Sequence, residues 1–197
     1  MSRFSRKTRI IAAFVVVVAA GFAFAVYWQS RNQVPTAFET ARDQGAIIAE
    51  SIVATSNTST AELAQVDQYD KQGDYTDALK LTQGLVSDSQ NLRNQAVDLS
   101  NQVEAMTQAL PSVSSLTAQQ DALEAISSDL ALINELVNYS GDLGKLLDTL
   151  QARFSGASGT ASEVTDEVTQ INTDINAINN FNNQATTAMQ AFDKIED

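Results

Sequence analysis

The 197-residue chain contains no cysteine and no histidine. Without cysteine it can form no disulfide, no thiolate metal site and no thiol nucleophile. Without histidine it lacks the usual general base near neutral pH, the Ser-His-Asp triad and imidazole-bound metals. The sequence also has no glycine-rich phosphate loop and no G-x-S-x-G turn. We therefore expect no catalytic residue, no cofactor and no metal site, and a protein that is not an enzyme.

Basic residues are scarce, and they are unevenly distributed. The chain has 12 Lys and Arg against 24 Asp and Glu, a net charge of −12. Four of the basic residues lie within residues 1–9, and the first acidic residue is Glu39. The chain from residue 29 onward holds the other 8 basic and all 24 acidic residues, a net charge of −16. Nucleic acid is therefore not an expected partner, because its binding requires Lys and Arg at the phosphates.

One long apolar run, residues 10–28, carries no charge. As a helix it would extend about 28 Å, close to the ~30 Å hydrocarbon thickness of a bilayer. We predict a basic cytoplasmic tail (1–9), a transmembrane signal anchor (10–28) and a juxtamembrane linker (29–34). By the positive-inside rule, the single-pass protein would lie in the plasma (cytoplasmic) membrane with its N-terminus inside and its C-terminal domain outside the cytoplasm. The residues predicted to anchor it are Arg3, Arg6, Lys7, Arg9, Tyr27 and Trp28.

A cleaved secretory signal peptide is the alternative for this segment. Ala23-Phe24-Ala25 resembles a signal-peptidase site, and cleavage there would release a secreted protein that begins at Val26. The apolar run continues to Trp28, past that site, which favours the anchor. Both alternatives export the same domain.

The chain has only two prolines, and their positions bracket the first half of the exported domain. Pro35 suits the first turn of a helix, and Pro111 disfavours helix at Leu110. Before Pro111, apolar or small residues alternate at spacings of three and four, which is the heptad pattern of a packed helix. They are Tyr75, Ala78, Thr82, Leu85, Ser89, Leu92, Ala96, Leu99, Val103, Met106 and Leu110.

Two further long helices follow, and their apolar residues predict which faces are buried. In the first, Leu116, Leu123, Ile126, Leu130, Ile133 and Val137 share one register, and the two glycines within 139–144 predict a kink. In the second, the stripe runs over Val164, Val168, Ile171, Ile175, Ile178, Phe181, Ala185, Ala188, Phe192 and Ile195. None of these stripes contains Asp or Glu. The strongest heptad-packing candidates are Leu85, Leu92, Leu99, Val103, Met106, Leu110, Ile171, Ile175 and Ile178.

Capping signals set the expected helix ends. Ser59 and Thr160 each begin an S/T-x-x-E capping box, Gly73 is a stop and Asp74 an N-cap. The expected helices are about 35–55, 60–71, 74–110, 114–154 and 161–195. We predict an all-α protein: a single N-terminal transmembrane helix followed by an elongated antiparallel, four-helix-type bundle over 35–197. The pattern leaves open whether helix 35–55 packs in the bundle or forms a stalk.

The turn near Gly73 carries two further patterns. Residues 69–79 resemble the turn of a tetratricopeptide repeat, but no second copy follows at the 34-residue period, which favours an ordinary helix-turn-helix. Four aspartates cluster here, but their spacing does not match a calcium-binding EF-hand. They are Asp67, Asp70, Asp74 and Asp77.

These features favour a non-enzymatic interaction or scaffolding module, bound to the lipid bilayer through residues 10–28, with a protein partner or its own copies. The alternative is a ligand-sensing bundle, which in outline resembles the periplasmic sensor domains of chemoreceptors. This chain departs from that pattern because it has no second membrane span and only a nine-residue tail. A sensor would have to signal through a separate partner. A secreted helical protein is the third possibility.

Overall fold

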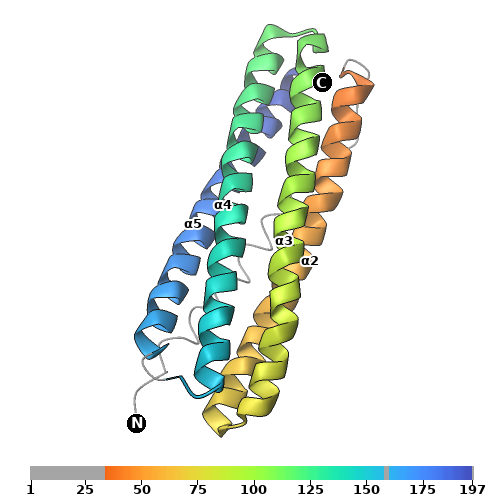
Figure 1. Cartoon of the computed structure of the whole chain (residues 1–197). Coiled ribbons are helices and arrows are strands. Elements are labelled where there is room, and N and C mark those ends of the chain that lie inside the picture. Colours follow the sequence, from red (N-terminus) through yellow and green to blue (C-terminus); the bar gives the residue numbers. More distant parts are fainter. Residues whose placement is uncertain (1–33, 158–159, 197) are drawn as a thin grey trace.

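The computed structural model describes residues 34–157 and 160–196, which form four long α-helices, one 3-10 turn and no strand (Figure 1). The helices are α2 (Thr36–Gln72), α3 (Tyr75–Ala109), α4 (Leu116–Phe154) and α5 (Thr160–Glu196), and the 3-10 turn spans Leu110–Ser112. Packing of α2 on α3, α3 on α4 and α4 on α5 makes an antiparallel bundle. The all-α and bundle predictions are confirmed for this part of the chain.

The predicted transmembrane helix lies outside the described residues, as do the six residues predicted to anchor it. Within 34–157 and 160–196, no helix combines the length and the apolar character that crossing a bilayer requires. The membrane anchor therefore stays a prediction.

The predicted break between helices 35–55 and 60–71 is wrong, because α2 is continuous. Ser59 does not cap a new helix. Its hydroxyl donates to the carbonyl oxygen of Thr55 at 3.0 Å and to Asp88 Oδ2 on α3 at 3.1 Å. A hydroxyl that bonds the preceding turn leaves the helical backbone intact. The whole of α2 therefore packs along α3 as one arm of the bundle.

The turn between α2 and α3 closes as the sequence predicts. Gly73 has a left-handed backbone, with φ of 76°. Its N–H donates to the carbonyl of Asp70 at 3.2 Å, and the N–H of Asp74 donates to that of Tyr69 at 3.0 Å. These two bonds satisfy the last carbonyls of α2. The Asp74 side chain then caps α3 by accepting the N–H of Asp77 at 3.2 Å.

Replacement of Gly73 by alanine is expected to lower the free energy of unfolding by about 1 kcal/mol, because a Cβ disfavours positive φ. Gly84, inside α3, is the matched control. A Cβ there would meet nothing within 4 Å, so Gly84→Ala should stabilise by about 0.5–1 kcal/mol. Urea denaturation measures both changes. If both variants changed the free energy of unfolding equally and in the same direction, the left-handed backbone assigned to Gly73 would be contradicted.

The residues predicted for heptad packing on α3 and α5 lie in the core. Eight of them are at most 9% exposed, and Leu110 is partly buried. The eight are Leu85, Leu92, Leu99, Val103, Met106, Ile171, Ile175 and Ile178. Tyr75, at the start of the same stripe, is half exposed and stacks on Phe154 with ring centroids 6.0 Å apart. This contact joins the start of α3 to the end of α4.

The predicted register of α4 is confirmed for Ile126 and Ile133, which are buried, and is wrong for its four other members, which are exposed. The predicted kink is wrong as well. The helix is continuous through residues 139–144. Its buried face begins with small side chains, Ala118, Ala122 and Ala125. The larger Leu116, Leu123, Leu130 and Val137 are exposed instead. Alanines on the inner face allow α4 to pack closely against its neighbours, and Ile126 and Ile133 are the large aliphatic side chains buried beside them.

The first and last helices meet near the end of the bundle that holds Thr36. Phe38 and Phe192 are fully buried, with ring centroids 5.3 Å apart. Arg42 Nη2 donates to both carboxylate oxygens of Asp193, at 2.9 and 3.1 Å. Burial lowers the pKa of Arg42 to about 10, although Asp193 opposes that shift, so the guanidinium stays charged at neutral pH. Taken as whole helices, α2 and α5 have backbones that approach each other less closely than those of α2 and α3 or of α4 and α5.

Candidate functional site

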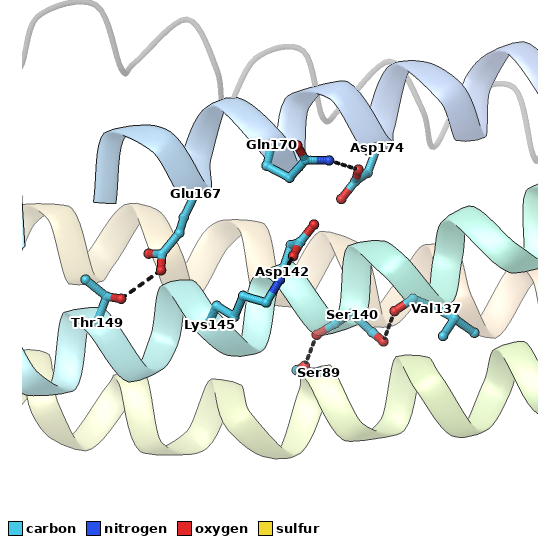
Figure 2. Close-up of polar contacts among 9 residues, drawn as sticks. All are labelled: Ser89, Val137, Ser140, Asp142, Lys145, Thr149, Glu167, Gln170 and Asp174. Atoms are coloured by element: carbon cyan, nitrogen blue, oxygen red, sulfur yellow. Dashed lines mark hydrogen bonds and ion pairs between the residues drawn. The ribbon is translucent and has the colours of Figure 1, made fainter. Parts of the chain in front are cut away.

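A cluster of polar side chains links α4 and α5 in the middle of the bundle (Figure 2). Asp142 on α4 and Asp174 on α5 point toward each other. Gln170 Nε2 donates to Asp174 Oδ1 at 2.8 Å, and the ammonium of Lys145 pairs with Asp142. Two carboxyl groups therefore face one another with a single ammonium beside them.

Asp174 is the unusual member of this cluster. It is only 2% exposed, and its Oδ2 has no hydrogen-bond partner. Burial raises the pKa of Asp174, and the nearby Asp142 raises it further, whereas the bond from Gln170 lowers it. At an ordinary pH this carboxyl group therefore holds a proton more readily than a solvated aspartate does.

Sequence reasoning missed Asp174, because it predicts no acid within the apolar stripes. That prediction is wrong for α4 and α5. Asp174 follows Ile171 by three residues and precedes Ile178 by four, a spacing that places it on the buried face and could have revealed it. On α4, Asp129 lies between Ile126 and Ile133 in the same way, and burial raises its pKa to about 7.

The carboxyl pair lines an open cleft of about 560 Å³ over the outer surface of α4. Two cationic side chains line it as well, Arg93 from α3 and Lys145. The hydrogen bond to Asp142 raises the pKa of Lys145, so its ammonium is stably charged. The lining thus presents both signs of charge, as a small zwitterion would require.

Buried hydroxyls beneath the cleft serve the packing of α3 on α4. Ser89 Oγ donates to the carbonyl of Ser140 at 2.7 Å, and Ser140 Oγ donates to that of Val137 at 2.8 Å (Figure 2). Arg93 Nε donates to Ser140 Oγ at 3.4 Å. Both hydroxyl protons are committed to backbone carbonyls, so neither serine is activated by a base as a nucleophile must be.

The second candidate surface is the exposed face of α4, which we call the outer stripe. Four of its members are aliphatic: Leu116 is 71% exposed, Leu123 53%, Leu130 49% and Val137 36%. They recur every seven residues, and a polar or small residue lies four positions after each. The outer stripe is therefore Leu116, Gln120, Leu123, Ser127, Leu130, Asn134, Val137 and Gly141. An aligned set of exposed aliphatic side chains is typical of an interaction surface.

The aspartates near Gly73 have other roles than metal binding. Arg153 Nη2 from α4 donates to both oxygens of Asp70, at 3.2 and 2.8 Å. Asp67 pairs with Lys71 one turn away, and Asp74 caps α3. In the described part of the chain, no three acidic side chains gather as metal ligands would. These acids hold the end of the bundle together.

Comparisons of the chain with protein-family models, curated proteins and solved structures give no match. The functional argument therefore depends on the geometry of the cleft and the outer stripe.

Proposed function

We propose that the chain is a membrane-anchored, non-enzymatic protein whose extracytoplasmic helical bundle acts as an interaction or scaffolding module. The outer stripe is the observation that carries this proposal. Four aliphatic side chains, from 36% to 71% exposed, lie along one line of α4, and their burial against a partner helix would be favourable. The absence of histidine and cysteine from the sequence supports a non-enzymatic role.

The apolar run at residues 10–28 and the basic residues before it support the membrane anchor. The test uses the full chain in bacterial cells. We expect it to stay in the membrane pellet after alkaline carbonate extraction, to begin at Met1 or Ser2, and to lose its bundle when protease is added outside the cytoplasm. Deletion of residues 10–28 should leave the bundle soluble. If the mature chain begins at Val26 and is not found in the membrane, the anchor hypothesis is wrong and the protein is secreted.

A ligand-sensing role is the second candidate, and Asp174 favours it. Its Oδ2 is buried without a hydrogen-bond partner, and the residue lines a cleft that Glu135, Asp142, Lys145 and Arg93 also line. The two carboxyl groups suit the ammonium of an amino acid, and the cations suit its carboxylate.

The test is a thermal shift with single amino acids. At a concentration 100-fold above Kd, an amino acid that binds should raise the melting temperature by about 5–10 °C. Because an ammonium needs ionised Asp174, the shift should shrink as the pH falls through the pKa of that group. Asp174→Asn should lose it, while Asp148→Asn, an exposed aspartate on α4, should keep it. No shift with any amino acid at pH 7 would exclude this role.

A further inference from the structure

The outer stripe follows the heptad pattern of a two-stranded helix pair. Taking Leu116, Leu123, Leu130 and Val137 as d positions places Gln120, Ser127, Asn134 and Gly141 at a. Leucine at d is typical of parallel two-stranded coiled coils, and a single asparagine at a fixes their register. No helix of the described chain covers this face, because all four d side chains are exposed.

The outer stripe is also free of charge, in a chain with twice as many acidic as basic residues. Its eight positions include no acidic or basic residue, and the next exposed positions on this face, Lys145 and Asp148, mark its end. Burial of the part of the outer stripe from Leu116 to Asn134 would therefore desolvate no charge on the stripe itself. Near that end the surface is recessed, since Val137 and Gly141 line the cleft. At Gly141 the Arg93 side chain lies against α4, with its Nη2 3.5 Å from where a Cβ would be, so a partner helix would meet a guanidinium at this end.

We infer that the outer stripe binds the outer stripe of a second copy of this chain, with the two α4 helices parallel and in register. Each d residue would then pack against its own copy. The amides of Gln120 and Asn134 both donate and accept hydrogen bonds, so each can pair with the same residue opposite. At the edge of this pair, Glu124 of one copy comes opposite Gln119 of the other, which avoids contact between two acids.

The parallel orientation rests on the proposed membrane anchor. Thr36 and Leu116 begin at the same end of the bundle (Figure 1), so the 33 residues before Val34 join the chain at the end where the outer stripe starts. Two copies anchored in one bilayer would project in the same direction, with their α4 helices side by side. The contact would extend about 37 Å. A single pair of helices forms a narrow interface, which by itself binds weakly. Anchoring both copies in one bilayer would favour the dimer, because it raises the local concentration of each copy around the other.

Single-cysteine cross-linking tests this pairing, because the chain has no cysteine of its own. The full chain is placed in lipid vesicles as Gln120→Cys or Asn134→Cys and oxidised. In the parallel pair, each variant alone should form a disulfide-linked dimer. In an antiparallel pair the two equal positions lie about 20 Å apart, so only a mixture of the variants would cross-link, which would overturn the inferred orientation. Gln90→Cys, exposed on α3, is the control that should stay monomeric.

A second substitution tests whether the aliphatic residues drive the association. Adding Leu123→Glu and Leu130→Glu to Gln120→Cys should lower the cross-linked fraction at least about tenfold, since two carboxylates would have to be buried. Val97→Glu, at an equally exposed valine on α3, should leave it unchanged. Circular dichroism verifies that each variant folds.

The outcomes separate the pairing from the proposed anchor. Chains that float with the vesicles but do not cross-link at either position would overturn the self-association and leave the anchor standing. Chains that cross-link at Gln120 and Asn134 without floating would support the pairing and contradict the anchor. A cross-linked product that contains a different protein in intact cells, with no dimer in vesicles, would overturn the second copy as the occupant.

Discussion

Replacement of Phe192 by alanine is expected to lower the free energy of unfolding by about 3–5 kcal/mol, the range for a buried phenylalanine. The ring is fully buried, stacks on Phe38 at 5.3 Å and lies 5.7 Å from the Arg42 guanidinium carbon. Since α2 and α5 have fewer close backbone contacts than the helix pairs that follow one another in the chain, the cavity would remove a large part of the packing that joins α2 to α5. Guanidinium denaturation measures the loss.

Phe181→Ala is the matched control, because this phenylalanine is on the same helix but only partly buried. It should cost less than Phe192→Ala. Amide hydrogen exchange adds a local test: in Phe192→Ala the first turns of α2 should exchange faster, relative to wild type, than the middle of α4. Equal losses for both variants, with uniform exchange, would show that no special junction exists at Phe192.

Replacement of Asp129 by asparagine is expected to stabilise the protein at pH 8 by about 2–4 kcal/mol. Burial alone raises the pKa of Asp129 from 3.8 to about 7. A carboxyl group whose pKa is raised by folding favours the folded state below its unfolded pKa, near pH 4. That contribution is lost as the pH rises to 7 and the folded protein must hold a charge on a half-buried side chain. Asparagine carries no charge at any pH and avoids this loss.

The measurement is the free energy of unfolding of wild type and Asp129→Asn between pH 4 and pH 8. The two should agree near pH 4 and separate as the pH rises. Glu124→Gln, at an exposed glutamate on the same helix, should show a much smaller separation. A constant difference across the pH range would mean that the substitution acts through packing and not through ionisation.

Much of the fold follows from local rules that the sequence displays. On α3, Leu85, Leu92 and Leu99 are three leucines in succession at a spacing of seven, which indicates one register, and those side chains are buried. The Gly73-Asp74 turn can also be predicted locally. The positive φ favours glycine at position 73, and the N-cap of α3 is supplied by the carboxylate of Asp74. Features of this kind depend little on distant parts of the chain.

Other features depend on contacts that the sequence does not display. On α4, two apolar faces compete: one of alanines and one of leucines every seven residues. The packing of α3 and α5 decides between them: Ala122 is buried, whereas Leu123 is 53% exposed. Ser59 has a capping sequence, yet α2 continues because its hydroxyl bonds Thr55 and Asp88. Asp174 is a related case, because its burial depends on the packing of α5 against α4.

The continuity of α2 has a mechanical consequence. Its 37 residues form a single rod about 55 Å long, which joins the end where the chain enters the bundle directly to the Gly73 turn. At that far tip the Arg153–Asp70 ion pair ties α2 to α4. A pull or rotation applied near Pro35 would thus be delivered to the opposite tip without a hinge in between. The described bundle therefore has one stiff arm that runs from the end where the chain enters it to the tip at Gly73.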